Sequence, residues 1–125
     1  MDSSGVRFPA MRNEIVDAVR ALSDKDYQWS AWIRRELPPG RYDEFTHRVH
    51  ILYDDTDVLA NPYDTVGDYL RSTLEAAAMQ TLGAVLDQLF HSLGTERTDE
   101  EYLRAPGWPL VVTAAQAALA ALEQP

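Results

Sequence analysis

The chain has 125 residues, of which 46% are hydrophobic and 25% are charged, the balance expected of one globular domain. Its formal net charge of -9 disfavours nucleic acids and anionic membranes as partners, because both attract clustered Lys or Arg. The lack of cysteine excludes disulfides and thiolate metal sites and fits a reducing cytoplasm, where we expect the protein to reside. The most apolar stretch, residues 111–122, is too short to span a bilayer.

The chain is predicted to begin with a short flexible segment and a helix. Residues 1–8 are polar and contain glycine, so we expect them to be flexible. Pro9 suits the first turn of a helix that ends near Leu22, with Arg12 on its outer side. The predicted inner face of this helix is Met11, Ile15, Ala18, Val19 and Leu22.

A second helix is predicted over about residues 24–36. It places Trp29 and Trp32 on one side. We interpret both tryptophans as core anchors, because large aromatic side chains supply much of the buried area of a small protein. An exposed aromatic docking face is the alternative.

Residues 43–53 fit either a helix or a strand. One helical face would hold Phe45, Val49, Leu52 and Tyr53. The alternating pattern of a strand would hold Val49, Ile51 and Tyr53. We favour the helix, because Asp43 can cap it and no hairpin partner lies nearby in the sequence.

The longest predicted helix runs from Asn61 to Leu93 and forms the centre of the fold. Asn61 can cap it, and Pro62 suits its first position. Its apolar stripe is Val66, Leu70, Leu74, Ala77, Leu82, Val85, Leu89 and Leu93. The stripe changes direction near Gly83, which indicates either a bend or the close approach of another backbone.

Two short elements complete the predicted fold. Thr98 and Glu101 form a capping box that starts a short helix, and a last helix covers about residues 110–122. The sequence therefore predicts an all-α protein. Residues 1–125 form a single domain, a bundle of five or six helices built around the long central helix.

The long helix also offers surface beyond the core. One side would carry Asp64, Asp68, Arg71 and Glu75. These charges predict a surface ladder of ion pairs, with a partly buried network as the alternative. A homodimer is a further hypothesis, in which the bent stripe or the Trp29 and Trp32 face continues across a twofold axis.

The third helix carries a candidate metal site. It consists of Asp43, His47, His50 and Asp54, which share one side of a helix. Imidazoles and carboxylates can bind zinc or non-haem iron and activate water, as a metal-dependent hydrolase requires. A solvated polar face gives the same pattern and the spacing matches no established motif, so we expect no cofactor and keep a divalent metal as the alternative.

An acidic run follows the third helix. Its members are Asp54, Asp55, Asp57, Asp64 and Asp68. Such carboxylates can bind Mg²⁺ or Ca²⁺, but an EF-hand that starts at Asp54 needs glycine and glutamate where Leu59 and Thr65 stand. We interpret the run as an acidic surface that attracts a basic protein partner.

Two segments give the chain a resemblance to a known group of proteins. With the run Leu52-Tyr-Asp-Asp-Thr56 and the closing segment 99–108, it resembles a family of small, uncharacterised, cytosolic proteins from actinobacteria. The resemblance covers most of the chain and implies a cytoplasmic setting, but it carries over no functional residue. In size and acidity the chain also looks like bacterial immunity proteins that neutralise basic toxins.

These features favour a protein that is not an enzyme. The sequence has no Gly-x-Ser-x-Gly elbow and no glycine-rich phosphate loop. The leading hypothesis is an acidic protein–protein interaction module, similar to an immunity protein or a regulator. The alternative is a metal-dependent hydrolase that uses the His and Asp cluster.

Overall fold

The computed structural model describes residues 5–124, which contain helices and no strand. The helices are α1 (Pro9–Ser23), α2 (Lys25–Tyr27), α3 (Phe45–His50), α4 (Thr73–Leu93), α5 (Asp99–Leu103) and α6 (Trp108–Leu122). Two of them continue without a break as π-helical turns, α2 into η1 (Gln28–Ile33) and α3 into η2 (Ile51–Asp55). A 3-10 turn, η3 (Pro62–Thr65), precedes α4. The predicted all-α fold is confirmed.

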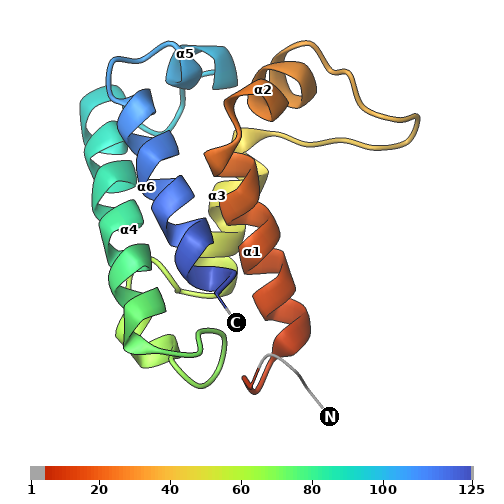
Figure 1. Cartoon of the computed structure of the whole chain (residues 1–125). Coiled ribbons are helices and arrows are strands. Elements are labelled where there is room, and N and C mark those ends of the chain that lie inside the picture. Colours follow the sequence, from red (N-terminus) through yellow and green to blue (C-terminus); the bar gives the residue numbers. More distant parts are fainter. Residues whose placement is uncertain (1–4, 125) are drawn as a thin grey trace.

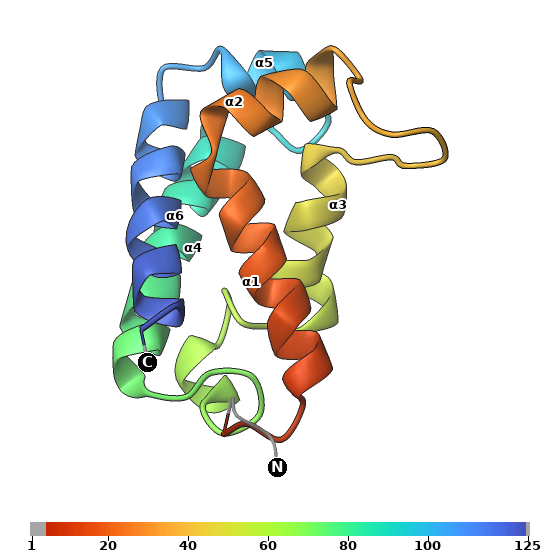
Figure 2. The ribbon, with the colours of Figure 1, turned by 45° about the vertical axis from the view of Figure 1, so that its right-hand side comes forward.

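The bundle is organised around α6. This helix packs against both α1 and α4, and the three lie side by side (Figure 1). α3 and η2 pack against α1 on the side away from α6 (Figure 2). α2 and α5 lie across the end of the bundle where α6 begins, and residues 56–72 close the opposite end.

The predicted inner face of α1 is confirmed, with one addition. The fully buried members are Ile15, Ala18, Val19 and Leu22. Met11 is half-buried. The prediction that Arg12 lies outside is wrong, because its side chain is only 5% exposed and reaches a carboxylate on α4.

Trp32 is a core anchor, as predicted. It is 1% exposed, its ring lies 5.9 Å from that of Phe45, and its Nε1 donates a 2.8 Å hydrogen bond to Asp43 Oδ2. Trp29 is half-buried, with the Arg104 guanidinium 5.0 Å from its ring centre. The alternative of an exposed aromatic docking face is therefore wrong for Trp32.

The predicted helix from Asn61 to Leu93 is too long. Asn61 makes no side-chain cap, and the helix proper begins at Thr73, where Ser72 Oγ accepts from Glu75 N at 3.3 Å. Between Asn61 and Thr73, the Thr65 carbonyl accepts hydrogen bonds from the N–H groups of residues 68, 69 and 70. Gly67 adopts a φ of +99°, which a right-handed helix does not allow. The chain therefore turns at residues 65–70 instead of running straight.

Gly83 marks the close approach of a second backbone, one of the two predicted explanations. A Cβ atom there would lie 3.1 Å from the carbonyl oxygen of Leu59. α4 continues through this position without interruption. The change in stripe direction has another origin, because Val66 and Leu70 lie in the turn before α4 and not on the helix.

Residues 45–55 are helical, so the helix prediction for residues 43–53 is confirmed over the strand. The predicted cap is wrong, because Asp43 is buried and its side chain faces Trp32. Instead, the N–H of Phe45 donates a 3.0 Å hydrogen bond to Asp99 Oδ2, from the first turn of α5. The start of α3 thus depends on a residue more than 50 positions away.

The segment before α1 is tied to the turn before α4. Arg7 N donates to Gly67 O at 2.8 Å, and Phe8 N donates to Asp68 O at 3.0 Å. Residues 1–4 of the segment predicted to be flexible lie outside the described part of the chain. At the other end, the Thr98 and Glu101 capping box is confirmed.

Gly83→Ala tests the close approach to Leu59. We expect the free energy of unfolding to fall by about 1 kcal/mol, because overpacking against the Leu59 carbonyl outweighs the higher helix propensity of alanine. Urea unfolding measures the change. Ala84→Gly, at the neighbouring exposed position, reports the propensity effect alone, and a stabilised Gly83→Ala protein would contradict the prediction.

A pair of variants at Asp99 tests the cap on α3. Burial raises the pKa of the Asp99 carboxyl, although the Phe45 N–H bond opposes the shift, and the Glu44 charge raises it further. Asp99→Ala should cost about 1 kcal/mol of stability, because it removes the acceptor. Asp99→Asn keeps an acceptor and removes the costly charge, so its stability should stay within about 0.5 kcal/mol of the parent protein. Equal losses in both variants would contradict the capping role.

Candidate functional site

The acidic run lies on the connection from η2 to α4. Asp54 and Asp55 end η2, Asp57 follows in a left-handed conformation with a φ of 59°, and Asp64 belongs to η3. These four residues are exposed, while Asp68, in the turn after η3, is partly buried. The five predicted partner-binding residues therefore share one continuous segment, which we call the acidic segment (residues 54–68).

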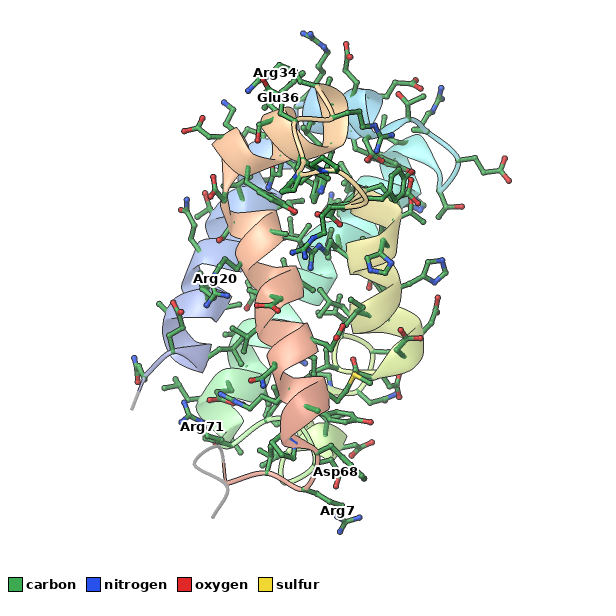
Figure 3. All side chains as sticks on the ribbon, turned by 90° about the vertical axis from the view of Figure 1, so that its right-hand side faces the viewer. Arg7, Arg20, Arg34, Glu36, Asp68 and Arg71 are labelled. Carbon is green, nitrogen blue, oxygen red and sulfur yellow. The ribbon has the colours of Figure 1, made fainter. Side chains whose placement is uncertain are left out.

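The carboxylates of this segment are only partly neutralised. Asp54 contacts His50 Nδ1, and Asp68 lies 3.5 Å from Arg7 Nε in an exposed pair at one end of the molecule (Figure 3). Asp55 and Asp64 have no side-chain hydrogen bond and no ion pair with any residue that the structure describes. Exposed ion pairs of this kind contribute little, so the segment keeps a negative field.

The four residues of the candidate metal site do not converge. Asp43 is buried away from His47, which is exposed, while His50 and Asp54 pair with each other on the surface. Across residues 5–124 no three His, Cys, Asp or Glu side chains form a group that could hold a metal ion. The sequence pattern is that of a polar helix face with one buried neighbour.

Asp43 has a structural environment. Its Oδ2 accepts from the Tyr27 hydroxyl at 2.5 Å and from Trp32 Nε1 at 2.8 Å, and Arg48 Nε lies 2.9 Å from its Oδ1. Burial of the Tyr27 hydroxyl, then its bond to Asp43, raises the pKa of Tyr27. This network joins η1 to α3 and holds the Asp43 carboxylate in a buried position.

A groove runs between α3 with η2 on one side and the second half of α4 on the other. We call it the α3–α4 groove. Its lining residues are Phe45, Thr46, Val49, His50, Tyr53, Asp54, Asp87, Phe90, Thr95, Glu96 and Tyr102. Among them are five apolar or aromatic side chains and three carboxylates, so the groove combines an apolar floor with an acidic rim.

Sequence reasoning missed this groove. The predicted helical face of residues 43–53 includes Val49 and Tyr53, but the predicted stripe of the long helix does not include Asp87 or Phe90. The available signal was the spacing of Asp87 and Phe90, which lie one turn apart on a face of α4 different from that of Leu86. That face meets Tyr53, whose hydroxyl donates to Asp87 Oδ1 at 2.6 Å.

The predicted ladder of Asp64, Asp68, Arg71 and Glu75 is replaced by a buried network. Arg12 Nη1 and Nη2 donate to the two Glu75 oxygens at 2.8 and 3.0 Å, and Arg71 Nε donates to the same carboxylate at 3.1 Å. Both arginines also donate to the Leu122 carbonyl at 3.0 Å, at the end of α6. The alternative of a partly buried network is therefore correct for Arg71 and Glu75, whereas Asp68 pairs with Arg7 and Asp64 forms no ion pair with a described residue.

The comparisons with known proteins identify a family and no function. Residues 6–125 match the sequence model described as Domain of unknown function (DUF7945), and the chain belongs to that family. Neither the curated proteins nor the solved structures contain a match. In the described part of the chain, no helix has the length and hydropathy needed to cross a membrane.

The ionisation of Glu75 predicts an acid-sensitive fold. Burial raises the pKa of Glu75, but the bonds from Arg12 and from Arg71 N, with the Arg12 charge, lower it below its ordinary value. Folding thus favours the ionised form, so the stability it contributes is fully present above the ordinary pKa and is lost as pH falls through the folded-state pKa.

Glu75→Gln tests this network. At neutral pH we expect a loss of about 3 kcal/mol in the free energy of unfolding, because Arg12 keeps a buried charge without its carboxylate. Urea unfolding between about pH 6 and pH 3 should show a weaker pH dependence in the variant than in the parent protein. Glu14→Gln, at an exposed position on α1, is the control and should leave both quantities nearly unchanged.

Proposed function

We propose that this member of the DUF7945 family is a non-enzymatic interaction module that binds a basic protein partner through its acidic segment. The observation that carries the proposal is the distribution of charge. In residues 49–96 the only Lys or Arg is Arg71, and its side chain donates to Glu75 and to the carbonyls of Leu122 and Gln124. Among the described residues, the ion-pair partners of the acidic segment are Arg7, which pairs with Asp68, and His50, which contacts Asp54.

The physical basis of such binding is electrostatic attraction between opposite charges. Asp55 and Asp64 form no ion pair with a described residue. Binding a cation therefore costs them less free energy than it costs a carboxylate that must first break an internal ion pair. Attraction over several ångströms speeds the encounter and weakens as salt screens it. A cytoplasmic setting and an immunity-like or regulator-like role are parts of this proposal, supported by the size and net charge of -9.

Charge-neutral variants test the proposal. The parent protein, Asp55→Asn/Asp64→Asn and Glu14→Gln/Asp26→Asn are each immobilised, and proteins that bind at about 50 mM salt are identified and then purified. We expect a basic partner whose affinity falls several-fold in the Asp55→Asn/Asp64→Asn protein and less than twofold in the matched control, which loses the same two charges elsewhere.

The same experiment can contradict the proposal. Equal affinity for all three proteins would mean that the acidic segment is not the binding surface. Affinity that does not change between about 50 and 300 mM salt would remove the electrostatic basis. Turnover of a substrate by the pure protein would show an enzyme.

A further inference from the structure

The α3–α4 groove is built from aromatic rings that contact one another. Phe90 lies at its centre, with ring centres 5.9 Å from Phe45, 5.7 Å from Tyr102 and 6.2 Å from Tyr53. Phe90 and Tyr53 are half-buried, so each ring uses one part of its surface for the core and leaves another part open to the groove. Open aromatic faces carry partial negative charge and attract cations.

The rim of the groove carries the complementary charge for a cation. Asp87 and Asp54 stand on opposite sides, on α4 and η2, and Glu96 lies on the loop before α5. Tyr53 holds one oxygen of Asp87, and His50 contacts one oxygen of Asp54, which orients both carboxylates and leaves their second oxygens unused by described residues. No Lys or Arg is among the described residues that line the groove.

Two other depressions of the surface differ in this respect. The one beside the start of α3 mixes both signs, with Arg35, Arg97 and Arg104 beside acidic residues. The one between α4 and α6 contains no charged residue, and Leu110, which is 63% exposed, lines it. Of these three described surfaces, the α3–α4 groove alone combines an apolar floor with carboxylates and no Lys or Arg, and its one imidazole, His50, contacts Asp54.

We infer that the α3–α4 groove is the docking site for an arginine side chain of the basic partner, carried on a segment with apolar neighbours. A guanidinium group is planar, so it can lie flat on the Phe90 ring, to which the Tyr53 ring is inclined at 64°, while its edge donates to Asp54 and Asp87. Lysine has a compact, strongly hydrated charge and gains less from the same floor. The inference rests on the proposed function and names the place where the partner's key residue binds.

The test uses a defined probe in place of the partner. A capped amphipathic peptide of roughly 15 residues, with Arg on one face and Leu on the other, is titrated into the isotope-labelled protein and followed by NMR. Two matched peptides carry Lys or Gln in place of Arg. We expect shifts centred on Thr46, Tyr53 and Phe90, and affinity that falls several-fold with Lys and about tenfold with Gln.

Variants of the protein locate the site. Asp54→Asn/Asp87→Asn should weaken binding of the Arg peptide about tenfold. The hydrogen bond from Tyr53 to residue 87 is kept, because the asparagine side-chain oxygen still accepts. Phe90→Leu keeps apolar bulk and removes the ring, so it should weaken the Arg peptide about fivefold and leave the Gln peptide unchanged. Thermal unfolding of each variant checks that the fold is intact.

The outcomes separate this inference from the proposed function. If the Arg peptide binds and Asp55→Asn/Asp64→Asn weakens it as much as Asp54→Asn/Asp87→Asn does, the groove is not the site, and the acidic module stands. If no Arg peptide binds at about 50 mM salt, the groove inference is overturned, and the proposed function is decided by the partner experiment alone. Equal affinity for Arg and Gln peptides would also overturn it.

Discussion

The carboxylate of Glu75 holds together the end of the bundle that carries the acidic segment. It receives Arg12 from α1 and both the N–H and the side chain of Arg71 from the turn before α4. The two arginines then extend the network to the Leu122 carbonyl at the end of α6. One buried charge therefore fixes α1, the start of α4 and the end of α6 relative to one another. Such a group is costly to bury, so all of these partners are needed together.

This network also fixes the route of the acidic segment. Because Arg71 binds Glu75, the turn at residues 65–70 must end beside the Glu75 carboxylate. Arg12 Nη1 also donates to the Tyr69 carbonyl within this turn. Leu59, earlier in the same connection, is held against Gly83 of α4. The apolar side chains of the connection therefore point inward, and its aspartates at residues 54–64 are exposed to solvent.

The elements that sequence reasoning predicted correctly are those that depend on local signals. Pro9 starts α1, and the Thr98 and Glu101 capping box starts α5, because the stabilising partners lie within one turn. Asp43 was expected to cap α3 by the same logic, but the cap comes from Asp99, which only the tertiary fold brings there.

The prediction that Arg12 lies on the outer side of α1 is wrong for a related reason. It occupies a position next to the apolar face of α1, where an arginine ordinarily reaches the solvent, and its partner is 63 positions away. The candidate site divides in the same way. The acidic segment can be recognised from the sequence alone. The α3–α4 groove cannot, because it forms only where the fold brings Asp54 on η2 and Asp87 on α4 to the same groove.

The placement of the arginines explains why one side of the molecule stays acidic. Three arginines neutralise carboxylates that are almost fully buried, namely Arg12, Arg48 and Arg71. Arg20, Arg34, Arg97 and Arg104 pair with exposed acidic neighbours on α1, on α5 and beside the loop after η1. No Lys or Arg lies at residues 49–70, and the described ion pairs of the acidic segment are those of Asp68 with Arg7 and of Asp54 with His50. A cation from outside the chain can approach Asp55, Asp64 or Asp87 at little structural cost, since none of the three forms an ion pair within residues 5–124 that would have to break.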